Sequence, residues 1–207
     1  MSSIFDSINS WNYRPFRRMG VTICEELRMG KLVSSIIKRI NPKKVLEIGC
    51  GNCLVTLSVE KETKLPSLVS IEVWNEEITD KEVKDYLKGE DYNLVENLFP
   101  LPFKEKSFDL AYSVLYFYNK IRKERSDLAN EVSKVIKDNG YFILIEPEIV
   151  RNMRKDFFNA GFSEVEYHVD QGIFFSLMKK VDTNIQRSIT SSGLGIPRIH
   201  TLGNNHK

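Results

Sequence analysis

The chain has 207 residues, of which 42% are hydrophobic and 28% are charged, and its net charge is +2. This length and balance predict one globular domain with a full core. No apolar run approaches the roughly 18 residues that span a bilayer, and the N-terminus lacks the apolar centre of a secretory signal. We therefore expect a cytoplasmic protein without membrane contact. The three cysteines, Cys24, Cys50 and Cys53, are too few for a disulfide framework.

The positive charge is concentrated at the two ends of the chain. Residues 1–40 and 182–207 carry an excess of Lys and Arg, whereas residues 41–181 are mildly acidic. Nucleic-acid binding usually needs a concentrated basic face, so we do not expect that partner. These stretches divide the chain into an N-terminal helical cap, a central domain and a polar tail. A homodimer would form through the cap or the tail.

The stretch that organises the central domain is Lys44-Val45-Leu46-Glu47-Ile48-Gly49-Cys50-Gly51-Asn52-Cys53. An apolar run that ends in two closely spaced glycines predicts a buried parallel strand followed by a tight turn. A helix is predicted directly after it, from Leu54 to Glu60. Because the first N–H groups of a helix have no partner within the helix, they suit a polar or anionic group of a ligand.

The rest of the chain alternates strands with helices. Further strands are predicted at 67–72, 92–95, 108–115 and 141–145, and helices at 25–40, 75–88, 120–137 and 149–159. Asp138-Asn139-Gly140 is expected to end the third of these helices with a left-handed cap. Two last strands, at 164–168 and 173–178, predict an antiparallel hairpin with its turn at Asp170-Gln171-Gly172. This order predicts an α/β fold with helices on both faces of a mostly parallel sheet.

Four blocks of sequence follow one another at characteristic distances. They are Val45 to Gly51, Glu72 after the next strand, Asn97 with 101–103 and 107–110, and Lys134 to Gly140 before the fifth strand. In this order they resemble the class I S-adenosylmethionine-dependent methyltransferases, in particular those that methylate metabolites. The resemblance covers about residues 41–180. It implies a Rossmann-like sheet of seven strands in the order 3-2-1-4-5-7-6, with one antiparallel strand, and S-adenosylmethionine as the cofactor.

The resemblance also implies a set of cofactor-binding residues. The set comprises Glu47, Gly49, Cys50, Gly51, Glu72, Val73, Asn97, Leu98 and Ser113. Glu47 would help to fix the ammonium of the methionine part, and the glycines would let the backbone approach it. Glu72 would accept both ribose hydroxyls, as an acidic strand end does in dinucleotide folds. Asn97 would accept a hydrogen bond from the adenine amine.

Two positions depart from the family pattern. Cys53 stands where a third glycine often occurs, and Asn97 stands where an aspartate is usual. Cys50 and Cys53 also form a Cys-x-x-Cys motif, but no second Cys or His pair completes a metal site, so we expect no metal. A hydride-transferring dehydrogenase is the nearest alternative enzyme, and its Gly-x-Gly-x-x-Gly motif would require glycine in place of Leu54.

Candidate catalytic residues lie where strands four and five end, because ligands bind at the carboxyl ends of strands in open α/β sheets. They are Tyr116, Tyr118, Glu146 and Glu148. A base is required only if the acceptor is a hydroxyl, because methyl transfer depends chiefly on alignment in a dry pocket. Two functions stay open: a methyltransferase for a small molecule, with RNA or protein as variant acceptors, and a non-catalytic relative that uses the fold for binding.

Overall fold

The computed structural model describes residues 20–71, 92–95 and 100–181. The predicted helix at 75–88, the first 19 residues of the predicted N-terminal cap and the tail lie outside these ranges. So do four predicted cofactor-binding residues, Glu72, Val73, Asn97 and Leu98. In the described part of the chain, no helix is both long enough and apolar enough to cross a membrane.

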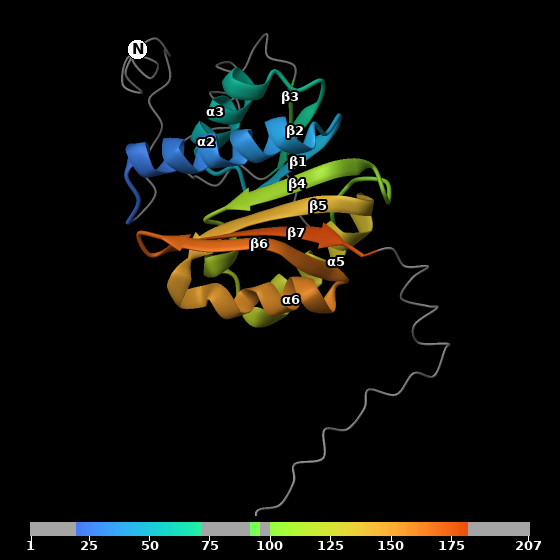
Figure 1. The fold of residues 1–207 in the computed structure, drawn as a ribbon. Helices are drawn as coiled ribbons and strands as arrows, with labels where there is room; N and C mark the ends of the chain where they lie inside the picture. The colour runs from blue at the N-terminus through green and yellow to red at the C-terminus, as the bar shows by residue number, and fades with distance from the viewer. Residues whose placement is uncertain (1–19, 72–91, 96–99, 182–207) are drawn as a thin grey trace, which may run out of the picture.

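The described residues form one seven-stranded sheet with helices on both faces (Figure 1). Its strands are β1 (Val45–Ile48), β2 (Leu68–Ile71), β3 (Tyr92–Val95), β4 (Phe108–Val114), β5 (Ile136–Pro147), β6 (Phe162–Asp170) and β7 (Ile173–Lys180). The helices are α2 (Ile23–Ile40), α3 (Leu54–Thr63), α5 (Arg122–Val135) and α6 (Arg154–Asn159), with short 3-10 helices η1 (Phe117–Asn119) and η2 (Glu148–Met153).

The strand order is β3-β2-β1-β4-β5-β7-β6, which confirms the predicted Rossmann-like sheet. The first five strands in this order pair in parallel, and β7 runs antiparallel to both of its neighbours. The predicted hairpin turn is confirmed as well. Gln171 and Gly172 have φ angles of 50° and 75°, which matches a two-residue turn with positive φ at both central positions.

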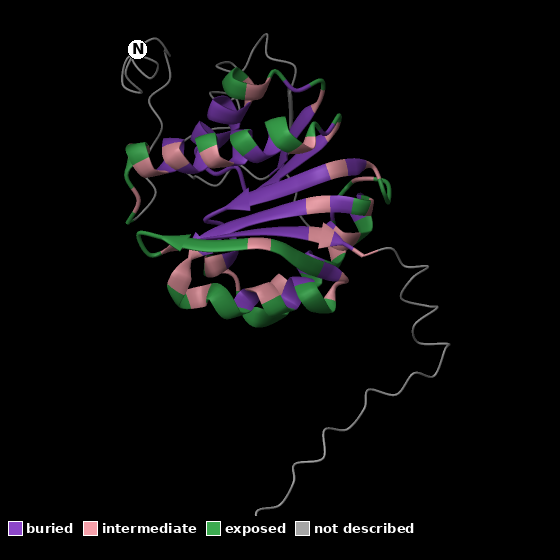
Figure 2. Cartoon of the chain, in the orientation of Figure 1, coloured by how far each residue is buried: buried purple, intermediate pink, exposed green. Residues whose placement is uncertain are grey.

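Strands β1, β2, β4 and β7 and the second half of β5 are largely buried, which explains their nearly continuous apolar sequences, whereas the edge strand β6 is mostly exposed (Figure 2). Side chains alternate between the faces, as the period of two requires. In β1, for example, Val45 packs with α2 and α3, whereas Leu46 packs with α5 and α6. The carboxyl ends of β1, β4 and β5 therefore meet at one edge between two layers of helices, where a ligand site is expected.

The predicted cap at Asp138-Asn139-Gly140 is wrong. Helix α5 already ends at Val135, and β5 begins at the next residue. Asn139 does have a positive φ of 61°, but it lies in a bulge of β5, where the register with β4 shifts between Phe108 and Leu110. A left-handed residue suits a bulge as well as a helix cap, and pairing with β4 selects the bulge.

The predicted helix at 149–159 is divided into two pieces, η2 and α6. Val150 interrupts it with a φ of −103° and a ψ of 15°.

At the start of α2, the helix begins two residues before the predicted position. Thr22 caps it, since its hydroxyl accepts the N–H of Glu25 while the Glu25 carboxylate accepts the N–H of Thr22.

Asp109 joins the entry of β1 to β4 and gives a testable pH dependence. Its carboxylate accepts the N–H groups of Lys43 and Lys44 at 2.9 and 2.8 Å and pairs with the Lys137 ammonium at 2.6 Å. Partial burial alone would raise the pKa of Asp109, but Lys137 and the two N–H groups together lower it.

We expect Asp109→Asn to lower the free energy of unfolding by about 1 to 2 kcal/mol at pH 7. A lowered carboxyl pKa stabilises the fold above the ordinary value of about 3.9, and this contribution is lost as the pH falls through the folded-state pKa. Urea denaturation between pH 7 and pH 2 should therefore show the two proteins converging in acid. A constant difference over this range would contradict the assignment.

Candidate functional site

The turn after β1 has the left-handed backbone that its glycines predict. Gly49 and Gly51 have φ angles of 75° and 54°, and the N–H groups of Gly49 and Cys50 donate to the Ile71 carbonyl of β2. Cys53 also has a positive φ, of 57°, just before α3 begins. A side chain in this conformation costs roughly 1 to 2 kcal/mol, which explains why glycine is common at this position in the family that the sequence resembles.

Glu47 lies beneath the turn and joins three elements. It is 2% exposed, and its Oε2 accepts hydrogen bonds from Ser70 Oγ of β2 at 2.7 Å and from Thr56 Oγ1 of α3. Burial and then the negative charge of Glu47 raise the pKa of Tyr112, which lies in β4. Glu47 is thus built into the support of the turn, and its contact with an ammonium stays a prediction.

Sequence reasoning missed a second support, between Glu26 of α2 and Asn52 of the turn. Both side chains are fully buried, and Asn52 Nδ2 donates to the two Glu26 oxygens at 3.1 and 2.8 Å. Asn52 Oδ1 accepts the N–H of Leu54 at 3.0 Å, in the first turn of α3. One signal was visible in the sequence: Glu26 is the charged residue on the otherwise uncharged, buried stripe of α2.

We expect Glu26→Ala to lower the free energy of unfolding by about 1 to 3 kcal/mol, because the buried Asn52 amide loses its acceptor. Glu26→Gln is the matched control, since it keeps one acceptor oxygen of the same reach and should lose less. Urea denaturation measures both. Equal losses below about 0.5 kcal/mol, the range of ordinary surface substitutions, would show that this contact does not support the turn.

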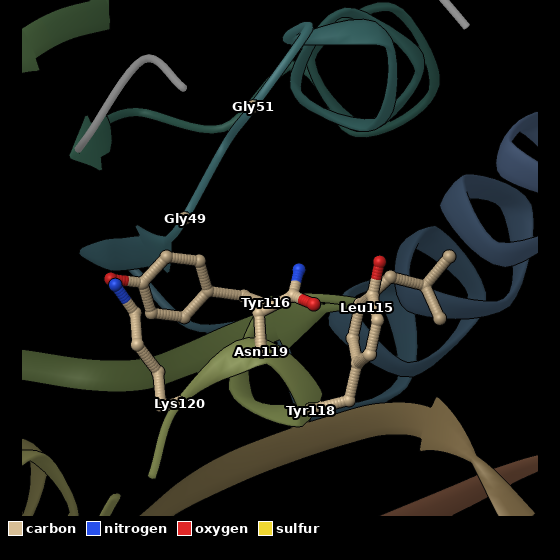
Figure 3. Close-up of a pocket in the computed structure, with 7 residues that line it drawn as sticks. All are labelled: Gly49, Gly51, Leu115, Tyr116, Tyr118, Asn119 and Lys120. Atoms are coloured by element: carbon tan, nitrogen blue, oxygen red, sulfur yellow. The ribbon is translucent and has the colours of Figure 1, made fainter. Parts of the chain in front are cut away.

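The loop between β4 and α5 faces the glycine turn across a small cavity (Figure 3). Its volume is about 40 Å³, and its lining residues are Gly49, Gly51, Leu115, Tyr116, Tyr118, Asn119 and Lys120. The Tyr116 ring lies directly on the turn: a Cβ added to Gly49 would be 2.1 Å from Tyr116 Cδ2. The Lys120 ammonium lies 4.7 Å from the centre of the same ring. Asn119 and Lys120 were not predicted, because no sequence motif marks them.

The four catalytic candidates have different places. Tyr116 and Tyr118 line the cavity. Glu146 is fully buried, and its Oε1 accepts the N–H groups of Tyr116 and Phe117 at 2.9 and 2.6 Å. Glu148 is partly exposed and pairs loosely with an arginine one turn later in η2. Neither glutamate lines the cavity, but Glu146 supports the loop that carries Tyr116 and Tyr118.

Two remaining predicted residues contribute to the frame of the site. The Ser113 hydroxyl is buried and donates to the Ile48 carbonyl at 2.9 Å, so it fixes β4 against the end of β1. The thiols of Cys50 and Cys53 are buried, lie 3.2 Å apart and form no disulfide. Among the described residues, no group of three or more His, Cys, Asp or Glu side chains is placed to hold a metal ion.

Comparison with known proteins is consistent with this geometry. Residues 46–144 match the family model described as a methyltransferase domain. A comparison with curated proteins finds no match. The matched segment runs from β1 to β5 and includes the glycine turn and the loop that faces it.

Many solved structures share the fold. One is a SAM-dependent methyltransferase from Methanosarcina mazei, with a TM-score of 0.57, 19% identity, and coverage of 70% of this chain and 97% of that one. Another is the 1,6-didemethyltoxoflavin-N1-methyltransferase of Burkholderia thailandensis, solved with S-adenosylhomocysteine, with a TM-score of 0.61, 15% identity, and coverage of 76% and 79%. A third is the [4+2]-cyclase SpnF, with a TM-score of 0.65, 12% identity, and coverage of 81% and 86%.

At these identities the structural matches establish the fold alone. The family model adds a match at the level of the amino-acid sequence, over residues 46–144. Residues 46–144, just under half of the chain, thus match a methyltransferase domain, on the fold that these solved structures share.

Proposed function

We propose that this protein transfers a methyl group from S-adenosylmethionine to a small-molecule acceptor. The observation that carries the proposal is the left-handed turn at Gly49 and Gly51, which opens onto a cavity at the carboxyl end of β1. Where a backbone is free of side chains, a ligand can lie directly against it. The match of residues 46–144 to a methyltransferase domain supports the same cofactor.

The residues around the turn fit the amino-acid end of this cofactor. Gly49 and Gly51 present bare backbone, and Lys120 places a cation at the cavity that can pair with the methionine carboxylate. The cavity of about 40 Å³ is far smaller than the several hundred Å³ that small-molecule sites usually occupy. We infer that the Tyr116 ring moves off Gly49 to admit the cofactor. Glu72 and Asn97, outside the described residues, are proposed to bind ribose and adenine.

When bound, the cofactor supplies a methyl group on a positively charged sulfur. Tyr116 and Tyr118 can attract that charge through their ring faces and exclude water from the cavity. Glu146 holds the loop that carries them, through the N–H groups of Tyr116 and Phe117. We assign it a positioning role, and no general base is required if the acceptor is an amine or a thiolate.

A small-molecule acceptor is supported by the Burkholderia thailandensis enzyme, which was solved with 1,6-didemethyltoxoflavin. A non-catalytic relative that uses the fold for binding is the second candidate, because one fold can host different functions. The similar SpnF, for example, is named a [4+2]-cyclase and not a methyltransferase. We retain a cytoplasmic location and a homodimer through residues 1–40 or 182–207 as predictions.

Titration calorimetry with S-adenosylmethionine tests the proposed function. We expect saturable binding, and we expect Glu72→Ala to weaken it much more than Cys53→Ala, because only Glu72 is assigned a contact with the ribose. At a cofactor concentration 100 times the dissociation constant, the fold should gain about 2.7 kcal/mol, which is measurable as a thermal shift. The absence of both heat and thermal shift would rule out the methyltransferase.

A further inference from the structure

A second pocket lies between α2 and the β6–β7 hairpin, and we call it the α2–hairpin pocket. Its volume is about 190 Å³, and its lining residues are Arg28, Met29, Leu32, Ile145, His168, Asp170, Ile173 and Phe175. The first half of α2 and the hairpin turn lie at the same side of the molecule, where β4 and β5 end (Figure 1). The pocket thus shares the carboxyl edge of the sheet with the glycine turn.

The floor of the pocket is apolar and aromatic. Ile145, Phe175 and His168 are register partners on the adjacent strands β5, β7 and β6, so their side chains form a row across the sheet. The His168 ring stacks on the Phe175 ring, with 4.6 Å between centres and 25° between planes. Met29 and Leu32 of α2 form the opposite wall. A flat apolar group is the ligand that such a slot accommodates best.

The volume indicates the size of that group. A dry apolar cavity of about 150 Å³ in another protein binds benzene, so a pocket of about 190 Å³ holds one aromatic ring with a small substituent. A larger ligand would have to extend out of its open side.

The rim of the pocket carries one ion pair, between Arg28 and Asp170 at 2.5 Å. The Arg28 side chain is 39% exposed and the Asp170 side chain is 63% exposed, so the aspartate is the partner that a ligand displaces more easily. Only one arginine nitrogen, Nη1, makes this contact among the described residues, and a guanidinium has five N–H donors. The rim therefore favours a carboxylate over an amine.

The two cavities have neighbouring lining residues at the ends of β4 and β5. Leu115 lines the cavity at the glycine turn, Ile145 lines the α2–hairpin pocket, and the N–H of Leu115 donates to the Ile145 carbonyl at 2.9 Å. With neighbouring strands about 4.8 Å apart, β5 lies about 10 Å from β1. A ligand in the pocket can thus extend across Leu115 towards Tyr118.

We propose that the α2–hairpin pocket binds the ring of an aryl carboxylic acid, and that this ring is the non-reacting part of the methyl acceptor. The acceptor role rests on the proposed function, whereas binding of the ring does not. The atom that receives the methyl group lies about 10 to 15 Å from the ring, at the cavity beside Gly49.

Methionine methyl resonances of the full-length chain test this proposal. Met29 lines the pocket, whereas Met153 and Met178 are buried on the opposite face of the sheet. Titration with phenylacetate should shift the Met29 methyl signal saturably and leave the other two unchanged. Benzyl alcohol and benzylamine, as neutral and cationic probes, should bind at least five-fold more weakly.

Substitutions provide matched controls. Arg28→Gln should weaken phenylacetate binding at least five-fold. Arg39→Gln should change it less than two-fold, because Arg39 forms the same kind of pair from α2 to β6, with Glu166 at 2.6 Å, outside the pocket. Leu32→Trp should fill the pocket and abolish the Met29 shift. No saturable shift at millimolar phenylacetate, equal effects of the two arginine variants, or tighter binding of benzylamine would overturn the proposal.

Calorimetry with S-adenosylmethionine separates this inference from the proposed function. If the cofactor binds and phenylacetate does not, the pocket assignment alone fails. If phenylacetate binds and the cofactor does not, the pocket is a binding site for an aromatic ring. The proposal that this ring belongs to a methyl acceptor is then overturned.

Discussion

Gly49→Ala is expected to weaken S-adenosylmethionine binding by about 10- to 100-fold. Gly49 has a φ of 75°, a conformation that costs a side chain about 1 to 3 kcal/mol. The added methyl group would also lie 2.1 Å from Tyr116 Cδ2, so the ring must move. Both changes disturb the place where the cofactor's methionine end is proposed to lie. Titration calorimetry gives the dissociation constants.

Gly172→Ala is the matched control for backbone strain. Gly172 has the same φ of 75° in the hairpin turn, and no atom lies within 4 Å of its added Cβ. This variant should lose stability but keep cofactor affinity within two-fold. The double variant Gly49→Ala/Tyr116→Ala should recover part of the lost affinity by removing the overlap. Equal affinity of Gly49→Ala and the wild-type protein would contradict the placement of the cofactor.

Glu146→Ala is expected to lower the free energy of unfolding by about 4 kcal/mol. The substitution removes the acceptor of two backbone N–H groups, those of Tyr116 and Phe117, at a fully buried position. Each buried donor left without a partner costs about 1 to 3 kcal/mol. The loop that carries Tyr116 and Tyr118 should loosen at the same time, so cofactor affinity should fall as well. Urea denaturation and calorimetry measure the two effects.

Two controls separate support of the loop from proton transfer. Glu146→Gln keeps a carbonyl oxygen for the N–H groups and should lose much less stability than Glu146→Ala, with near-normal turnover once an acceptor is known. Glu148→Ala removes a partly exposed pair at 3.5 Å and should cost less than about 1 kcal/mol. If Glu146→Gln were stable and bound cofactor but lost turnover, Glu146 would be a general base and the positioning role would be wrong.

The strands were predictable because they are short apolar runs bounded by glycine, proline or charged residues, and their order was predicted from the resemblance to the class I S-adenosylmethionine-dependent methyltransferases. The strand Tyr92–Val95 and the hairpin turn at 170–172 occur at the predicted residues. The end of α5 was not predictable from local sequence. Asn139 takes the left-handed conformation in either a helix cap or a bulge, and only the pairing of β5 with β4 decides between them.

The glycine turn of the candidate site was visible in the sequence, whereas its supports were not. Glu26 and Asn52 lie 26 positions apart and meet only when α2 packs on the turn. Glu146 was predicted as a strand-end carboxylate, but a sequence does not tell whether such a group faces a ligand or a neighbouring loop. The contact of Tyr116 with Gly49 likewise depends on the path of the loop after β4.

Glycine amide resonances test the central claim most directly. In protein labelled with ¹⁵N-glycine, titration with S-adenosylhomocysteine should shift the Gly49 and Gly51 amide signals saturably, because both residues line the cavity beside β1. The signals of Gly161 and Gly172, which also have positive φ angles but lie outside that cavity, should stay in place. Unchanged Gly49 and Gly51 signals at millimolar S-adenosylhomocysteine would contradict a cofactor site on this turn.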